Sequence, residues 1–300
     1  MKLLYLLFYS LVLIILILVS YSLYNIIDDI KILNLRRDLN YNEENRINDV
    51  NLLGTHNSLT YKIHNYFSPF GKTQSLNLQQ QYNIGARYFD LRFKKINNEL
   101  IAFHGVIDLG LNIKEVFDIF FTILKQNNSF ILLSVRKEES KEPINIEKDI
   151  YTYFIKNDKT EQVLFNNGIN IPTIKDLKNK IFFINIYKDD VEFEFISWPY
   201  NTIFSKFNLY VEDVNDTSIE NKIKLIKEML IQHRPSCINI IFFSLQTNIY
   251  TSIKYISSTI HKKILDSGVL KDKKGFIFVF DYLNNIYSYK NKLITNIMLE

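Results

Sequence analysis

Two histidines and one arginine, His56, His104 and Arg92, are the side chains of this sequence best suited to acid–base chemistry. Histidine titrates near neutral pH, so one imidazole can take a proton from an attacking hydroxyl while a second gives a proton to the leaving oxygen. Arginine presents a fork of N–H donors that matches the oxygens of a phosphate group. This combination predicts phosphoryl transfer without a metal ion.

These and other ionisable residues lie where short apolar runs end. His56 follows the first run, and Asp281 ends the last. The charged residues at the ends of the intervening runs are Asp90, Arg92, Arg136, Lys137, Glu138 and Asp213. Each has an ordinary explanation when taken alone, but their joint placement at strand ends favours a single site. Three further histidines occur in polar or helical segments and are expected to be exposed: His64, His233 and His261.

The apolar runs alternate with segments of helical spacing from residue 49 onward. The runs predicted as strands are 50–53, 86–93, 100–103, 130–135, 180–186, 207–211, 238–243 and 276–280. The clearest predicted helices are 113–124, 146–155, 219–231 and 250–265. Eight strands interleaved with helices indicate an α/β fold, and we expect a distorted (β/α)8 TIM barrel. An open doubly wound sheet is disfavoured because no glycine-rich phosphate turn follows the first strand.

Bulk composition fits one large domain. The 300 residues are 47% hydrophobic, which is ample for a single barrel core. A net charge of +4 without a clustered basic tract argues against a nucleic-acid partner. The single cysteine, Cys237, excludes an intramolecular disulfide or a thiolate metal cluster.

The N-terminal segment predicts contact with a membrane. Residues 3–19 are apolar except for Ser10, so 1–24 is expected to be a hydrophobic helix that serves as a transmembrane signal-anchor or as a cleaved signal peptide. Residues 25–48 are polar and predict a stalk, and 49–300 form the expected barrel domain. The protein is therefore predicted to be membrane-anchored, or exported if the segment is cleaved.

Three motifs resemble the X domain of phosphatidylinositol-specific phospholipases C, most closely the small single-domain bacterial type. They are residues 54–58 (GTHNS), 85–92 (GARYFDLR) and 103–105 (FHG). Segments 134–138, 198–199, 211–213, 240–245 and 280–282 also look like counterparts in the same order. The resemblance therefore extends from about residue 49 almost to the C-terminus.

The resemblance implies a TIM barrel that cleaves phosphatidylinositol, or a glycosylphosphatidylinositol, to diacylglycerol and inositol 1,2-cyclic phosphate. By position, His56 is similar to the family's general base and His104 to its general acid. Arg92 would hold the phosphate, Asp281 would orient His56, and Asp90 would support the arginine. The residues implied to bind inositol hydroxyls are Arg136, Glu138 and Asp213.

The sequence departs from the bacterial pattern at the acid and in the headgroup pocket. Asn57 stands where that type has an aspartate thought to pair with the acid, so His104 loses a charge that would keep it protonated. Ile186 stands where an arginine would face inositol, with Lys188 as a nearby substitute, and Asn215 replaces an aromatic residue. Because calcium-using relatives also carry asparagine beside their first histidine, calcium stays an alternative, although Arg92 already supplies the positive charge.

Two other functions stay open at this point. One is a phosphodiesterase for another phospholipid, and the other is a membrane-anchored inositol-lipid-binding module with weak or no turnover. Both histidines and Arg92 favour an enzyme, because a binding module has no need of an acid and a base. The expected partners are the lipid substrate and the membrane. Tyr66, Phe67 and Phe70 follow His56 in a loop region, and either contact with the lipid interface or packing under the loop would account for them. No motif points to a protein partner.

Overall fold

The computed structural model describes residues 41–64, 68–139, 145–188, 193–196, 198–199, 201–246 and 252–284, together with Tyr9, Val12, Leu13 and Leu16. Apart from those four residues, the predicted anchor at 1–24 lies outside the described residues, as does most of the stalk at 25–48, so both stay predictions. Across the described parts of the chain, no helix is long and apolar enough to cross a membrane. Residues 41–48 pack on the domain, where Ile47 is buried and Arg46 forms a β-bridge to Thr173.

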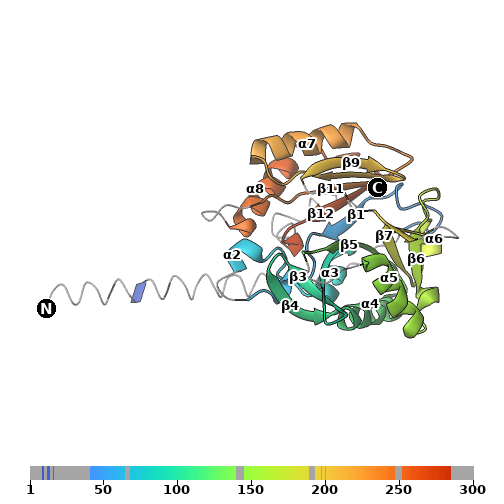
Figure 1. Cartoon of the computed structure of the whole chain (residues 1–300). Helices are drawn as coiled ribbons and strands as arrows, with labels where there is room; N and C mark the ends of the chain where they lie inside the picture. The colour runs from blue at the N-terminus through green and yellow to red at the C-terminus, as the bar shows by residue number, and fades with distance from the viewer. Residues whose placement is uncertain are drawn as a thin grey trace.

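A curled, mostly parallel sheet forms the centre of the molecule (Figure 1). Its hydrogen-bonded order is β6-β7-β5-β2-β1-β12-β11-β10-β9, and every neighbouring pair is parallel except β10 and β9. The bounds are β1 Leu52–Thr55, β2 Ala86–Ile96, β5 Ile131–Lys137, β6 Val163–Asn166, β7 Ile181–Lys188, β9 Thr202–Lys206, β10 Leu209–Asp213, β11 Ile238–Phe242 and β12 Phe276–Phe280. The predicted α/β class is confirmed.

Two details of the predicted barrel are wrong. The run at 100–103 is not a barrel strand, because β3 (Glu99–His104) pairs antiparallel with the outer half of β2 and with β4 (Ile107–Asn112). Its place is taken by β6, which lies beyond β7. The sheet is also open, since no ladder joins β6 to β9 within the described residues. A reciprocal amide pair links Asn166 of β6 to Asn208 at distances of 2.8 and 3.0 Å, beside the opening.

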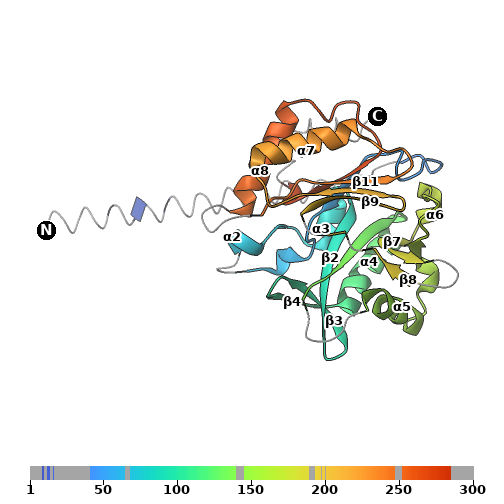
Figure 2. The same ribbon diagram turned by 45° about the horizontal axis from the view of Figure 1, so that its top comes forward.

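Helices cover the outside of the sheet, with α7 and α8 on one side and α4 and α5 on the opposite side (Figures 1 and 2). The long helices are α4 Ile113–Asn127, α5 Ile146–Lys156, α7 Ile219–Ile231 and α8 Ile253–Asp266, which agree with the predicted helices wherever the chain is described. The short elements are η1 Thr60–Lys62, α2 Ser68–Gly71, α3 Leu78–Asn83, η3 Thr160–Gln162, α6 Ile174–Leu177 and the edge strand β8 Phe193–Phe195. Asparagine caps α4, with Asn112 and Glu115 forming a capping box.

Alternation along the strands divides the core into two clusters. Residues that face the barrel interior pack together, among them Leu52, Tyr88, Leu132, Val211, Phe242 and Val279. Their neighbours along the strands pack outward with the helices, among them Phe89, Leu133, Phe183, Phe278, Phe117 and Ile260. Gly54 of β1 leaves room for the interior Tyr88 ring, because a Cβ there would lie 2.6 Å from Tyr88 Cδ1. Continuing the interior alternation from Tyr88 places Asp90 and Arg92 at the mouth.

Candidate active site

His56 and Asp281 meet because their strands are neighbours. Parallel pairing of β1 with β12 places Thr55 opposite Phe280, so the next residue on each strand projects from the same rim. His56 Nδ1 lies 2.7 Å from Asp281 Oδ1, and the His56 backbone N–H donates to the Phe280 carbonyl at 3.0 Å. A proton on Nδ1 satisfies the carboxylate and leaves Nε2 with a lone pair. His56 is therefore held in the form that can accept a proton.

Arg92 and Asp90 extend from β2 toward the same imidazole. Arg92 Nη2 donates to His56 Nε2 at 3.1 Å, and Arg92 Nε lies 3.7 Å from Asp90 Oδ2. Asp90 is fully buried and accepts a hydrogen bond from Ser134 Oγ at 3.0 Å. Burial alone would raise the pKa of Asp90, but the positive charges of Arg92 and Arg136 outweigh it and leave the pKa below its ordinary value. Asp90 is thus an anion that anchors both guanidinium groups.

His104 lies on the antiparallel ribbon rather than on a barrel strand. Its Nε2 is 3.1 Å from Asn57 Nδ2, while Asn57 Oδ1 is buried without a partner. Burial, and then the positive charge of Arg92, lower the pKa of His104 to about 3. The imidazole is therefore neutral at pH 7, and Nε2 accepts the amide proton. The opposite orientation of the Asn57 amide would offer Oδ1 to a protonated Nε2.

A second group of side chains surrounds Arg136 on the other side of Asp90. Its guanidinium pairs with Asp213 at Nη2, lies 3.9 Å from Asp90 Oδ1 at Nε, and stacks 4.8 Å from the Trp198 ring centre. The Trp198 indole N–H donates to the same Asp213 oxygen at 3.1 Å, while Asp213 Oδ1 is buried without a partner. An ion pair with one unused acceptor suits recognition of a hydroxyl-rich ligand.

Glu138 completes the set of predicted residues. It lies 3.5 Å from Arg92 Nη1 and accepts the Gly105 N–H at 3.2 Å, next to His104. All nine residues selected from the sequence therefore belong to one contact network: His56, Asn57, Asp90, Arg92, His104, Arg136, Glu138, Asp213 and Asp281. Lys137, by contrast, faces away with its ammonium 4.9 Å from the Phe195 ring centre.

The sequence analysis did not predict the neutral polar residues that hydrogen-bond to members of this network. Tyr88 donates to Ser134 Oγ at 2.6 Å, and Ser134 in turn donates to Asp90. Thr73 and Gln74 both donate to the His56 carbonyl, at 2.8 and 3.1 Å. These side chains are uncharged, so a search for charged residues at strand ends does not find them. Only Tyr88 could have been predicted, because it alternates along one strand with Asp90 and Arg92.

Ile186, which stands at the arginine position of the resembled family, and its expected substitute Lys188 both lie away from the network. Ile186 is fully buried in the outer core cluster that packs under the helices, and Lys188 directs its ammonium at the Tyr151 ring of α5, 5.1 Å away. The expectation that Lys188 compensates for Ile186 is therefore wrong. Asn215 is buried, with its side-chain oxygen lacking a hydrogen-bond partner.

The three remaining histidines differ in exposure. His64 is exposed as predicted, and His233 is half-buried against Phe276. His261 is 1% exposed and packs edge-on against Phe280, so the prediction of a surface residue is wrong. Both of its ring nitrogens lack a hydrogen-bond partner, and burial lowers its pKa to about 3.

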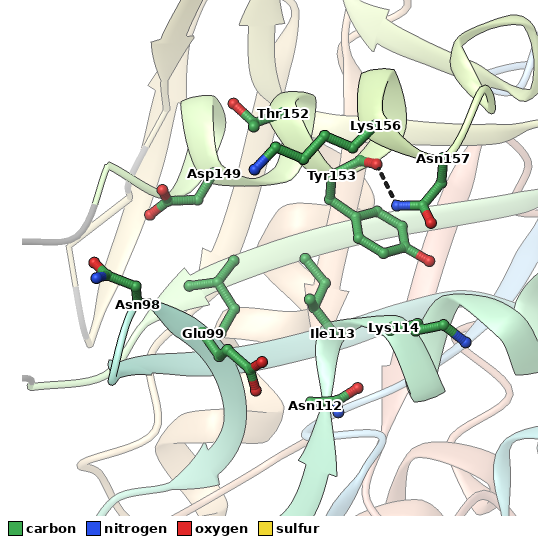
Figure 3. A pocket seen from close by; sticks show the side chains of 11 residues that line it. Asn98, Glu99, Asn112, Ile113, Lys114, Asp149, Thr152, Tyr153, Lys156 and Asn157 are labelled. Atoms are coloured by element: carbon green, nitrogen blue, oxygen red, sulfur yellow. Dashed lines mark hydrogen bonds between the residues drawn. The ribbon is translucent and has the colours of Figure 1, made fainter.

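A separate hollow lies outside the barrel between the β3–β4 ribbon and α5 (Figure 3). Its volume is about 340 Å³, and its wall mixes carboxylates with ammonium groups, including Glu99, Asp149, Lys114 and Lys156. None of the nine network residues lines it. Among the residues that the structure describes, no group of three or more His, Cys, Asp or Glu is arranged to hold a metal ion.

No protein-family model matches the sequence. Curated proteins do: the 1-phosphatidylinositol phosphodiesterase of Listeria monocytogenes is 27% identical over 55% of this chain, and the match spans 52% of that protein. The protein of the same name from Staphylococcus aureus strain Newman is 23% identical over 77% of this chain and 82% of its own length. The resemblance stated from the motifs is confirmed.

Solved structures of bacterial phospholipases C also superpose on this protein. A phosphatidylinositol-specific phospholipase C from Staphylococcus aureus superposes with a TM-score of 0.71 at 22% identity, covering 81% of this chain and 89% of that one. The enzyme from Listeria monocytogenes gives 0.66 at 20% identity, covering 84% and 96%. The fold is that of the bacterial phosphatidylinositol-specific phospholipases C.

Proposed function

We propose that the protein is a phosphatidylinositol-specific phospholipase C that cleaves the lipid phosphodiester without a metal ion. The observation that carries the proposal is the pair of imidazoles in one network with Arg92, with His56 Nε2 3.1 Å from the guanidinium. The similarity to proteins named 1-phosphatidylinositol phosphodiesterase supports the choice of substrate.

In the proposed reaction the inositol 2-hydroxyl attacks phosphorus and the diacylglycerol oxygen leaves. His56 takes the hydroxyl proton on Nε2, and Asp281 stabilises the resulting imidazolium through Nδ1. Arg92 binds the phosphate oxygens in place of a cation, which is the basis for proposing that no calcium is needed. His104 gives its Nε2 proton to the leaving oxygen. The products are diacylglycerol and inositol 1,2-cyclic phosphate.

The low pKa of His104 in the free protein, about 3, makes substrate part of the acid's activation. A bound phosphodiester carries a negative charge between the two imidazoles and also neutralises Arg92, whose charge contributes to the depression. Both effects raise the pKa of His104 toward the range in which it can act. Arg136, Glu138 and Asp213 would bind the ring hydroxyls that distinguish inositol from other headgroups.

The membrane is the proposed place of encounter, because the substrate is a lipid. Phe70 on α2 is 47% exposed, and Val106, in the turn directly after His104 and Gly105, is 89% exposed. These apolar side chains border the His104 side of the mouth and suit a bilayer interface. The predicted interface residues Tyr66 and Phe67 lie outside the described residues. The anchor at 1–24 would keep the domain near lipid, and its orientation stays a prediction.

Phosphorus NMR on phosphatidylinositol micelles tests the proposal directly. Residues 40–300 are incubated with substrate in EDTA and then in calcium, beside the variant His56→Ala. We expect cyclic inositol phosphate in EDTA, unchanged by calcium and absent with the variant. Product that needs calcium would refute the metal-free mechanism. If folded protein gives no product under either condition, the substrate is another phospholipid or the protein is the lipid-binding module. The lipid-binding module is the second candidate function because His104, the proposed acid, has no carboxylate partner.

A further inference from the structure

Gln74 occupies a buried position at the ends of the two neighbouring strands that lead to His56 and Asp281. It is 1% exposed and lies between α2 and α3, outside every strand and helix. Its Nε2 donates to the His56 carbonyl at 3.1 Å and to the Phe280 carbonyl at 2.7 Å. One side-chain amide group therefore connects the residue that acts as base with the residue immediately before Asp281.

The same amide also contacts the chain beyond Asp281. Gln74 Oε1 accepts the Leu283 N–H at 3.4 Å, so the side chain holds both sides of the β12 end. Thr73 reinforces the arrangement, since its hydroxyl donates to the His56 carbonyl at 2.8 Å and its carbonyl accepts the Tyr282 N–H. Backbone contacts thus fix the segments on which the imidazole and the carboxylate stand.

We propose that Gln74 is a positioning residue for the reaction: it sets the distance and angle between His56 and Asp281 and thereby keeps the base ready. This inference rests on the proposed function, because it assigns a role within that mechanism. Gln74 touches neither imidazole nor carboxylate, so it acts through their backbones. A displacement of about 1 Å at such a pair can lower a rate on the order of 10²-fold.

The hydrogen-bond inventory separates this role from a general contribution to folding. Without the Gln74 amide, the His56 carbonyl still accepts from Thr73, and the Phe280 carbonyl still accepts the His56 N–H at 3.0 Å. Neither carbonyl would be left unsatisfied, and the Gln74 partner that loses its acceptor is the Leu283 N–H, whose hydrogen bond is long at 3.4 Å. We therefore expect loss of Gln74 to loosen geometry more than it destabilises the fold.

Gln81 of α3 supplies a matched control. It is also a buried glutamine, 0% exposed, whose Nε2 donates to two backbone carbonyls, those of Ser58 at 2.8 Å and Leu76 at 2.6 Å. Neither carbonyl belongs to His56 or to the β12 end. Replacing either glutamine by methionine removes the same chemistry from a similar environment, and only the Gln74 change disturbs the base and its carboxylate.

The experiment is a double-mutant cycle with Asp281→Asn, measured as kcat and KM on phosphatidylinositol. Gln74→Met is expected to lower kcat roughly 10- to 100-fold with KM within about 2-fold, because ground-state lipid binding is untouched. In the Asp281→Asn background the same change is expected to cost less than about 3-fold, since the pairing that it protects is already lost. Gln81→Met is expected to change kcat less than about 2-fold in both backgrounds. Equal losses from Gln74→Met in both backgrounds, or no loss in either, would overturn the proposal.

Two further measurements keep the outcomes separable. Gln74→Glu preserves side-chain volume and the acceptor for Leu283 N–H, but in the protonated form that burial favours it has one O–H donor for the two carbonyls, so it should reproduce part of the kcat loss if the methionine variant is too unstable. Proton NMR of the His56 Nδ1–H needs no turnover: we expect its downfield signal in the natural protein and in Gln81→Met, and a shifted or exchange-broadened signal in Gln74→Met. An inactive natural protein with this NMR pattern would refute the proposed function and leave the positioning role standing. An unchanged signal would refute the positioning role.

Discussion

The two imidazoles of the candidate site are supported very differently. His56 extends from a central barrel strand, is buried, and is fixed by a carboxylate at 2.7 Å and by backbone contacts from Thr73 and Gln74. His104 lies on an antiparallel ribbon outside the barrel, is half-buried, and is held by the neutral amide of Asn57 and by the Gly71 backbone rather than by a carboxylate. The comparison indicates that the proposed base is organised in the free protein, whereas the proposed acid would need bound substrate to become charged.

The largest effect expected from this asymmetry concerns the leaving group. His56→Ala and His104→Ala should each lower activity on phosphatidylinositol by about 10³-fold, within the usual range for acid–base groups. With an inositol phosphodiester whose leaving group is 4-nitrophenolate, a weak base that needs no proton, His104→Ala should regain most of its activity and His56→Ala none. Absorbance of released nitrophenolate measures both. Equal rescue of the two variants would contradict the assigned roles.

A carboxylate beside His104 should reduce the asymmetry. Asn57→Asp places a negative charge near Nε2, which now lies 3.1 Å from a neutral amide, so the pKa of His104 should rise from about 3. Each unit of increase makes the protonated acid about tenfold more abundant at neutral pH, and we expect a gain of roughly 10- to 100-fold in kcat/KM. The limb of the pH profile that reports the acid should move to higher pH. Asn57→Ser, which adds no charge, is the control, and an unmoved limb in Asn57→Asp would count against His104 as the acid.

The sequence predicts the charged residues of the site better than the strands and neutral side chains that position them. Seven of the nine network residues were predicted because charges at the ends of parallel strands meet at one rim, whereas His104 ends an antiparallel strand and Asn57 was selected through the family resemblance. The element that carries His104 was not predicted correctly, since an apolar run at 100–103 has the same pattern whether its partner strand is parallel or antiparallel. The strand at 163–166 was missed because four residues give too little periodicity. Gln74 carries no charge and follows no strand, so only tertiary structure reveals it.

His261 shows a signal that was present in the sequence and was not used. The buried face of α8 comprises Ile253, Ile256, Ser257, Ile260, His261 and Ile264. These positions follow the i, i+3, i+4, i+7 spacing of an apolar helix face, so His261 falls on the inward side. The prediction that His261 is exposed treated the helical segment as a surface segment and did not apply this periodicity, which places His261 on the buried face.

Burial of His261 also predicts how the stability of the protein depends on pH. His261 packs 5.1 Å from the Phe280 ring, next to Asp281, and its pKa in the folded protein is about 3 against an ordinary value of 6.5. The unfolded chain binds a proton as pH falls through 6.5 and the folded protein does not, so stability is lost between about pH 6.5 and 3. At pH 5 the loss is about 2 kcal/mol at 1.4 kcal/mol per unit. His261→Phe should remove it.

Urea unfolding at pH 7 and pH 5 measures this effect. The free energy of unfolding of the natural protein should fall by about 2 kcal/mol more than that of His261→Phe between the two pH values. His64→Phe, at an exposed histidine, is the control and should behave like the natural protein. Parallel falls in all three proteins would show that His261 binds its proton equally in the folded and unfolded states, and would contradict the low pKa in the folded protein. The loss of stability in acid would then have to come from other titratable groups.

The smallest expected effect lies on the His104 side, where apolar side chains face solvent. Val106→Ser should weaken binding to phosphatidylinositol-containing vesicles by about fivefold, because partial burial of one such side chain contributes on the order of 1 kcal/mol. Hydrolysis of a soluble short-chain substrate should be unchanged, since Val106, 89% exposed, lies in the turn after the histidine and contributes no polar group to the network. Ile169→Ser, at an 81% exposed residue after β6, is the matched control and should leave vesicle binding unaltered. Equal binding by all three proteins would remove the ribbon from the interface, and His104 would then be exposed to water rather than lipid during turnover.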